Sequence, residues 1–347
     1  MLWLSPWMRP LARIHVEALR AAGAEVLLVT SDQHPSSDAP RPYELVVDPR
    51  PKTARTWPEA ARAASHVRQF APNVVVSEIV RDPRWMAFAP GVPRIELIHD
   101  DRPHDDGETL PRWERSVFGW WASRSSRTVA FSEYVAQSVR AGAVVPLTSD
   151  LEDISVPPVV EAANRRNFVL VGRLNEYKNI DVCLQAWELH TGGDGWRGDD
   201  LLLLGERASE WRQPLPRHVQ WRHTPFRYAD VLPVLARAKG SIVHYRRASQ
   251  SGVQVLSMQL GVVPIVSGEG ALPEFQPPGE TPIAVDDVEA LARAFDALAD
   301  PQQATMRGAA ARAHYVRRYS AAASSAALVE VLQEVALNVR PNTSQQS

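Results

Sequence analysis

Two segments in the second half of the chain combine glycine with basic or hydroxyl side chains in patterns that suit phosphate binding. In the first, a buried-strand pattern ends at Gly172 and is followed by Arg173 and Lys178. A guanidinium can bind two phosphate oxygens in a fork, and an ammonium adds a mobile point charge. The segment therefore predicts a diphosphate site, with a solvated loop carrying ordinary surface cations as an equal alternative.

The second segment begins an apolar helical pattern with Ser251, Gly252 and Val253. Unpaired N–H groups at the positive end of a helix dipole form an anion site. If both segments follow strands of one sheet, they face the same way. A merely structural helix cap is the alternative, and the pattern alone does not choose between them.

The first half of the chain carries a stretch rich in histidine and acidic residues. A strand pattern over 94–98 is followed by His99, Asp100, His104 and Glu108. Imidazole and carboxylate groups can ligate divalent metals, but a proline-containing loop makes a poor preformed cage, so no metal site is predicted. We expect His99 to lie at the carboxyl end of its strand and to face a cleft, where it can hydrogen-bond a ligand, unless it is only satisfied at its strand end. The other three either line a ligand pocket or cap the next helix.

Three tryptophans, Trp113, Trp120 and Trp121, lie close together in a helical stretch. Tryptophans at this spacing more often belong to a core. An aromatic, arginine-rich rim would instead suit a lipid-linked ligand at a membrane surface. The sequence leaves both interpretations open.

The elements that position these residues follow a regular alternation. Apolar runs of strand length alternate with amphipathic stretches of helix length, which predicts an α/β class built from βαβ units around parallel sheets. The segment 150–158 separates two such sets. We expect two Rossmann-like domains facing across a cleft, with function at the carboxyl ends of the strands. The predicted parts are domains over 1–156 and 157–320, a helix over 321–340 that can return to the first domain, and a flexible tail over 341–347.

The composition excludes several other classes of protein. The chain has 347 residues with 38 basic and 40 acidic side chains, so its net charge of −2 gives no footprint for general nucleic-acid binding. One cysteine excludes an intramolecular disulfide and a Cys-based zinc site. No apolar run approaches the length of a membrane span, and the first residues lack the apolar run of a signal peptide. We therefore expect a cytoplasmic protein.

The order of motifs in the second half resembles the donor half of family 4 GT-B glycosyltransferases. The motifs are Gly172-Arg173-Leu174 with Lys178, Leu204-Gly205-Glu206, His244-Tyr245 with residues 249–253, Gly261-Val-Val-Pro264 and Gly270-Ala-Leu-Pro-Glu274. In the first half, residues 97–108 and 131–134 are similar to stretches of bacterial polysaccharide-assembling members. Motifs that recur in order are more specific than any one of them alone.

The resemblance implies transfer of a sugar from a nucleotide diphosphate donor to a polysaccharide or lipid-linked acceptor, with retention and without metal or another cofactor. The first domain would bind the acceptor, and the second would bind the donor. The protein could also contact the inner face of the membrane. Catalytic roles fall on His99, Arg173 and Lys178, with His99 hydrogen-bonding the acceptor or the transferred sugar. Donor binding would involve Gly172, Arg173, Lys178, Ser251, Gly252, Val253 and Glu274, and the acceptor side would involve Asp100, His104 and Glu108.

One departure from the family pattern keeps two alternatives open. Many members carry two glutamates eight positions apart, where this chain has Ala248 and Leu256. The first βα loop, residues 5–10, also lacks glycine. A GT-B-like protein that binds nucleotide sugars without catalysis is therefore one alternative. A nucleotide-sugar 2-epimerase, which shares the architecture, is the other.

Overall fold

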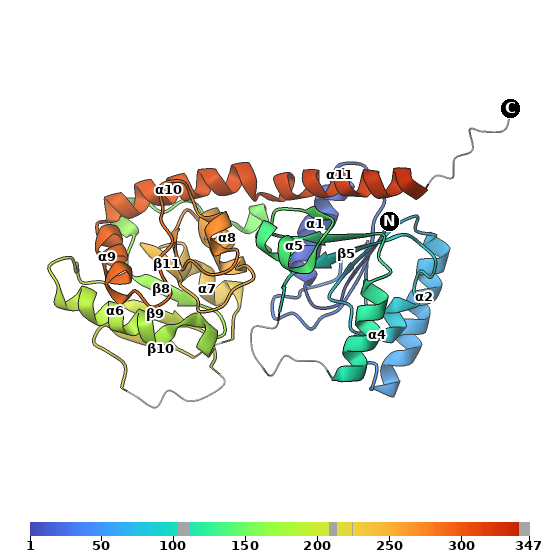
Figure 1. Ribbon diagram of the computed structural model, residues 1–347, viewed down its shortest axis with the longest axis horizontal. Helices are drawn as coiled ribbons and strands as arrows, with labels where there is room; N and C mark the ends of the chain where they lie inside the picture. The colour runs from blue at the N-terminus through green and yellow to red at the C-terminus, as the bar shows by residue number, and fades with distance from the viewer. Residues whose placement is uncertain (103–110, 208–213, 224, 340–347) are drawn as a thin grey trace. The chain divides into compact units, whose positions relative to one another are not determined.

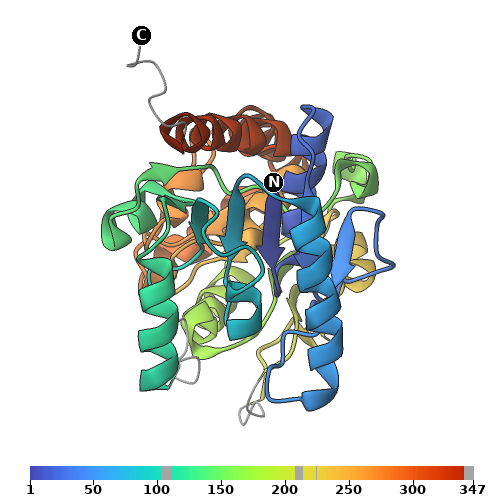
Figure 2. The ribbon, with the colours of Figure 1, turned by 90° about the vertical axis from the view of Figure 1, so that its right-hand side faces the viewer.

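The chain divides into two α/β units, which a computed structural model describes over residues 1–102, 111–207, 214–223 and 225–339 (Figures 1 and 2). The first unit comprises residues 1–150 and 321–347, and the second comprises residues 151–320. The predicted α/β class with two Rossmann-like parallel sheets is confirmed.

The first unit is built on a seven-stranded sheet in the order β3-β2-β1-β4-β5-β6-β7, in which all neighbours are parallel. The strands are β1 (Leu2–Ser5), β2 (Leu27–Thr30), β3 (Glu44–Val46), β4 (Val75–Glu78), β5 (Arg94–Ile98), β6 (Arg127–Ala130) and β7 (Ala143–Val144). The helices are α1 (Arg9–Ala21), α2 (Trp57–Phe70), α3 (Pro83–Met86), α4 (Arg112–Ala122), α5 (Glu133–Val139) and α11 (Ala321–Val339).

The second unit is built on a five-stranded parallel sheet in the order β10-β9-β8-β11-β12. Its strands are β8 (Phe168–Val171), β9 (Leu201–Leu204), β10 (Val219–Arg222), β11 (Gly240–Val243) and β12 (Val263–Val266). Its helices are α6 (Ile180–Gly192), α7 (Tyr228–Leu235), α8 (Gly252–Gln259), α9 (Val288–Ala299) and α10 (Pro301–Arg318).

Burial explains the sequence patterns of the strands. Every residue of β1, β2, β8 and β9 is buried, because helices cover both faces of a parallel sheet. The two larger apolar clusters of the second unit lie around Phe168, Trp187 and Phe295 and around Val169 and Leu235. Such strands can present polar groups only where they end.

The division after residue 150 differs from the predicted boundary at 156 for a physical reason. Leu151 is buried in the second unit's core, and the Gln259 side-chain amide donates to the Leu151 carbonyl oxygen at 3.1 Å. Helix α11 packs against α1, and the Ser324 hydroxyl donates to the Pro146 carbonyl oxygen at 2.6 Å. The last helix thus belongs to the first unit (Figure 1).

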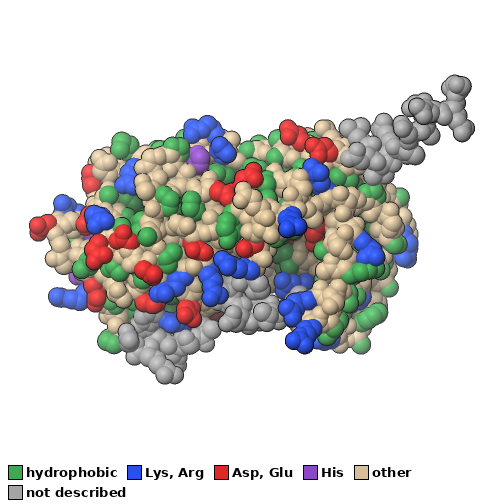
Figure 3. Space-filling model, viewed as in Figure 1, with side chains coloured by type: hydrophobic (Ala, Val, Ile, Leu, Met, Phe, Trp, Pro, Cys, Tyr) green, Lys and Arg blue, Asp and Glu red, His purple; other side chains and the backbone are tan. Residues whose placement is uncertain are grey.

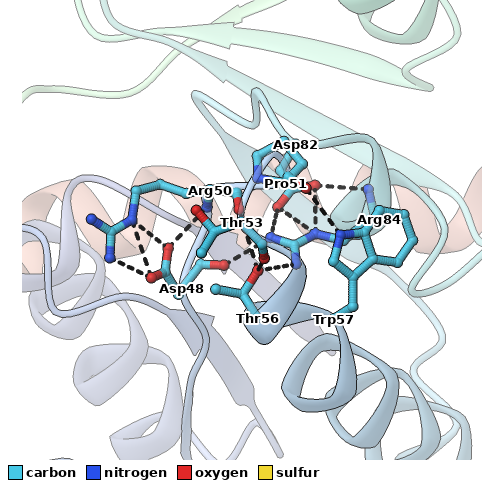
Figure 4. Close-up of polar contacts among 8 residues, drawn as sticks. All are labelled: Asp48, Arg50, Pro51, Thr53, Thr56, Trp57, Asp82 and Arg84. Carbon is cyan, nitrogen blue, oxygen red and sulfur yellow. Dashed lines mark hydrogen bonds and ion pairs between the residues drawn. The ribbon is translucent and has the colours of Figure 1, made fainter.

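A polar network fixes two loops at the carboxyl edge of the first sheet (Figure 4). The Arg84 guanidinium donates to Thr56 Oγ1 at 2.6 Å, to the Asp48 carbonyl oxygen at 2.9 Å and to Asp82 Oδ2 at 2.7 Å. Asp82 is buried and also caps α3 by accepting from the Arg84 backbone N–H at 2.9 Å. The loops after β3 and β4 are therefore tied together at this edge of the sheet.

Candidate functional site

The two predicted phosphate-binding segments follow neighbouring strands of the second sheet. β8 pairs in parallel with β11, and the chain leaves β8 toward β9 and β10 but continues beyond β11 toward β12. This is a topological switch point, where the loops after two strands diverge and leave room for a ligand. Both segments thus follow strands of one sheet and leave it at the same edge.

Lys178 joins these two segments. Its ammonium is buried and donates to the Val171 carbonyl oxygen at 2.9 Å and to the Tyr245 hydroxyl at 2.8 Å. The Ser251 hydroxyl lies 3.5 Å from the same Tyr245 hydroxyl. A chain of polar contacts therefore runs from the end of β8, through Lys178 and Tyr245, to the start of α8.

The buried position of Lys178 changes the acidity of this cluster. Burial lowers the pKa of the Lys178 ammonium, and the charge of Arg173 lowers it further, while Tyr177 acts in the opposite direction. Burial also raises the pKa of Tyr245 to about 12, so this phenol stays protonated at neutral pH. The phenol can thus accept from Lys178 while keeping its own proton.

Two glycines let the loops after β8 and β9 approach closely. Gly172 has a φ of +106° and Gly205 a φ of +149°. A Cβ on Gly205 would lie 1.8 Å from the Gly172 carbonyl oxygen, so no other residue fits without moving the backbone. A Cβ on Gly172 would lie in contact with Lys178 Nζ, at 3.4 Å, and would be strained by the positive φ. The glycine at the start of the predicted diphosphate loop thus leaves space beside the lysine.

Helix α8 begins as the sequence pattern predicts. Ser251 is its N-cap, and its hydroxyl accepts from the Gln254 backbone N–H at 3.4 Å. Gly252 is exposed, and a Cβ built on it would meet no atom within 4 Å. Val253 is half-buried. The first amides of the helix are therefore reachable from open space, as an anion site requires.

The other two predicted donor residues are exposed. Arg173 lies one residue beyond Gly172 on the surface of the loop. Glu274 lies in a 3₁₀ turn over Leu272–Phe275, and its backbone carbonyl oxygen accepts from the Tyr319 hydroxyl at 2.9 Å. The turn is thus anchored through its backbone while the Glu274 side chain is exposed.

The positions that depart from the family pattern are structural in this chain. Ala248 is buried, and a Cβ on Gly270 would lie 1.5 Å from the Ala248 carbonyl oxygen. Leu256 is buried in the apolar cluster with Val169 and Leu235. Neither position offers a carboxylate to a ligand.

His99 of the first unit is paired with a carboxylate that the sequence analysis did not single out. His99 Nε2 lies 2.6 Å from Glu78 Oε1; Glu78 is fully buried, and His99 is 8% exposed. The ring of Phe131 lies 4.8 Å from the His99 ring, centroid to centroid. Glu78 ends β4, and His99 directly follows β5, the neighbouring parallel strand.

The pair is ionised over a defined pH window. Burial alone would lower the pKa of His99, but the hydrogen bond and charge of Glu78, with the charge of Asp100, raise it. Burial alone would raise the pKa of Glu78, but the hydrogen bond and charge of His99 lower it. The ion pair therefore stabilises the fold at pH values above the pKa of Glu78 and below the pKa of His99. This stabilisation is lost when Glu78 protonates at low pH or when His99 deprotonates at high pH.

One signal in the sequence could have identified Glu78. The strand pattern over 74–77 is apolar up to Ser77, and an acidic residue follows directly. The structure extends this strand to Glu78, which places its carboxylate at the sheet's switch point between β1 and β4. Its partner His99 comes from a different strand, so only the pairing of β4 with β5 brings the two together.

The predicted acceptor-side residues are only partly described. Asp100 is exposed beside His99. His104 and Glu108 lie outside the described residues. Among the residues that the structure describes, no group of three His, Cys, Asp or Glu side chains is arranged to hold a metal ion. None of the helices in the described part of the chain combines the length and apolar character needed to cross a membrane.

Family models match both halves of the chain. Residues 12–148 match the model described as Glycosyltransferase Family 4, and residues 165–300 match the model described as Glycosyl transferases group 1. No curated protein sequence matches the chain at a significant level.

Solved structures of similar fold cover nearly the whole chain. Sucrose-phosphate synthase from Thermosynechococcus elongatus is 15% identical with a TM-score of 0.71, over 97% of this chain and 99% of that one. Anabaena HepE in complex with UDP is 15% identical with a TM-score of 0.65, over 96% and 99%. WaaG, a glycosyltransferase involved in lipopolysaccharide biosynthesis, is 12% identical with a TM-score of 0.59, over 95% and 99%.

Two Rossmann-like units with these family matches define a glycosyltransferase of GT-B fold. Because the two family models together match residues 12–148 and 165–300, the chain belongs to the family 4 type of these enzymes, as the order of its motifs predicts. The predicted fold class and enzyme class are thereby confirmed.

Replacing Glu78 by glutamine tests the electrostatic origin of the His99 shift. Burial would then be opposed only by the charge of Asp100, so the pKa of His99 should fall. Titration of the histidine ring signals by NMR measures this. Glu96→Gln is the control, because Glu96 is a partly buried carboxylate on β5 that accepts from the Ser77 hydroxyl and does not contact His99 in a hydrogen bond. An unchanged His99 pKa in Glu78→Gln would contradict the pairing.

Proposed function

We propose that this glycosyltransferase moves a sugar from a nucleotide diphosphate donor to a polysaccharide or lipid-linked acceptor, with retention of configuration and without a metal ion. The observation that carries the proposal is the meeting of Lys178, Arg173 and the start of α8 at the switch point of the second sheet. The structures of HepE with UDP and with UDP-glucose support a nucleotide-sugar donor. WaaG's part in lipopolysaccharide biosynthesis supports a glycan acceptor.

The chemical task is to stabilise negative charge on the departing diphosphate. Arg173 supplies an exposed guanidinium, Lys178 supplies an ammonium already held by Val171 and Tyr245, and the amides near Gly252 supply oriented dipoles. Fixed positive groups of this kind need no reorganisation when the charge develops. Here they would supply the stabilisation that a metal ion supplies in other enzymes. The leaving phosphate can then assist removal of the acceptor proton from the same face of the sugar, which retains the configuration.

We assign His99 to the acceptor or the transferred sugar. His99 Nε2 is hydrogen-bonded to Glu78, and the Phe131 ring packs against the imidazole, so the imidazole is held in one orientation. A held imidazole can hydrogen-bond a sugar hydroxyl with little loss of side-chain entropy. Asp100, His104 and Glu108 complete the proposed acceptor side, and Glu274 the donor hydroxyl contacts.

The proposed donor contacts do not include the family's usual carboxylates. Ala248 and Leu256 are buried apolar residues, so the ribose and sugar hydroxyls must find other partners. This feature also suits the alternative of a nucleotide-sugar-binding protein without catalysis. Turnover measurements on the intact protein separate the two, because that alternative binds UDP but releases none from a nucleotide sugar.

Removing either cation should weaken nucleotide binding. Arg173→Ala and Lys178→Ala should each cost about 1.5–3 kcal/mol of UDP affinity, the range of a charge-assisted hydrogen bond. Isothermal titration calorimetry with UDP measures the loss, and a thermal melt checks that each variant folds. Arg166→Ala is the control, since this exposed arginine precedes β8 instead of following it. Unchanged affinity in both variants would reject the donor site.

Chelation should leave transfer nearly intact. If side-chain cations and helix amides stabilise the leaving group, UDP release from a nucleotide sugar should proceed at a similar rate in EDTA. The rate is followed by a coupled UDP assay before and after addition of Mn²⁺. Loss of activity in EDTA that Mn²⁺ restores would refute metal independence.

His99→Ala should separate binding from turnover. Because His99 is assigned to the sugar or acceptor, turnover should fall on the order of 100-fold or more while UDP affinity stays within about twofold. His66→Ala, an exposed histidine on α2, should change neither quantity. A His99→Ala enzyme with near-normal turnover would overturn the assignment.

A further inference from the structure

We propose that the exposed face of α4 docks the enzyme on the surface of an anionic phospholipid bilayer. The inference goes beyond sugar transfer, and its test needs neither donor nor acceptor. The sequence leaves the role of three tryptophans open, and the structure separates them into two exposed rings and one buried ring.

Two of the tryptophans form an exposed apolar stripe. Trp113 is 57% exposed, Val117 37% and Trp120 55%. Their spacing of four and three residues places them on one side of the helix. Trp121 is only 8% exposed and belongs to the first unit's core. The core interpretation therefore holds for Trp121 alone, and the other two rings stand in solvent.

Arginines surround this stripe. Arg112 and Arg115 are exposed on the adjoining part of α4, and the Arg124 guanidinium lies 4.0 Å from the centroid of the Trp120 ring. The helix's one acidic residue, Glu114, is half-buried and lies seven positions before Trp121, on the inner side. Figure 3 shows hydrophobic and basic side chains gathered over the region of α4, at the lower right of the view.

A cavity lies beside the end of the stripe. It has a volume of about 430 Å³, and its lining includes Trp120, Trp121, Arg94 and Arg124. The Arg94 guanidinium lies 3.5 Å from the centroid of the Trp121 ring and is already engaged, since its Nε lies 3.6 Å from Glu96 Oε2 and it donates to the Ser125 hydroxyl at 2.9 Å. The exposed Arg124 is therefore the cation at this hollow that suits the phosphate of a lipid headgroup.

The chemistry of the face favours a bilayer over a second copy of the chain. Tryptophan rings and arginines together are the side chains that settle at the headgroup level, where the rings enter the boundary and the arginines meet anionic lipid. In a two-fold dimer through the same face, arginines would meet arginines. An anionic bilayer removes that repulsion, so it is the occupant we infer.

Docking through α4 has a consequence for the acceptor. α4 is the helix that connects β5 to β6, and His99 directly follows β5. A bilayer at α4 therefore lies against the same βα unit that carries His99. A lipid-linked acceptor would then reach this unit by diffusing in the membrane plane instead of through bulk water.

Vesicle binding by the full-length protein tests the proposal. The protein should co-sediment with phosphatidylcholine vesicles that contain phosphatidylglycerol, weakly with phosphatidylcholine alone, and less as salt rises. Trp113→Ala/Trp120→Ala should lower the partition coefficient roughly tenfold or more. Replacing Arg112 and Arg124 by glutamine should lower it about fivefold per arginine.

Matched controls lie on α2 of the same unit. Trp57 is 54% exposed, so Trp57→Ala removes an equally exposed ring, and Arg62→Gln/Arg68→Gln removes two exposed arginines. These variants should bind vesicles as the parent does, and thermal melts verify that every variant folds. UDP affinity should be unchanged in the α4 variants, which keeps this test separate from the donor site.

Two outcomes would overturn the proposal. One is equal loss of vesicle binding in the α2 and α4 variants, or no binding to anionic vesicles at all. The other is a dimer of the parent protein, seen by analytical ultracentrifugation, that Trp113→Ala/Trp120→Ala converts to a monomer, because the face would then be occupied by a second copy.

Discussion

A parallel sheet covered by helices on both faces can offer polar groups to a ligand only at its strand ends, and both units obey this constraint. Strands such as β1 and β8 are buried along their whole length. The charged groups of interest lie where strands stop: Glu78 ends β4, His99 follows β5, and Lys178 donates back to the last residue of β8. The switch point of each sheet then decides which of these ends have room for a ligand.

Burial at those ends makes each charge depend on a partner. Lys178 keeps its ammonium in a buried position by donating to a carbonyl oxygen and to a phenol that burial keeps protonated. Glu78 and His99 hold each other's charge against the cost of burial. Each partner comes from the loop or strand end next to it in the sheet. The local chemistry therefore follows from strand order as much as from residue type.

The same logic explains how the chain departs from its family without losing the fold. The buried Ala248 packs against the loop that contains Gly270, and Leu256 of α8 packs into the apolar core. Both are apolar where many relatives carry carboxylates, yet the helix start at Ser251 and the Lys178 contact to Tyr245 are intact. The geometry of the proposed phosphate contacts therefore does not depend on these two positions.

The sequence by itself determined the α/β class, the two parallel sheets and the family, because strand-length apolar runs, helix periodicity and ordered motifs are local signals. It also identified the segments at Gly172 and Ser251. It did not pair His99 with Glu78 or Lys178 with Tyr245, and it could not separate Trp121 from Trp113 and Trp120. Those distinctions depend on which strands become neighbours and which side of a helix meets a core. Residues far apart in the chain decide both, so only the tertiary structure reveals them.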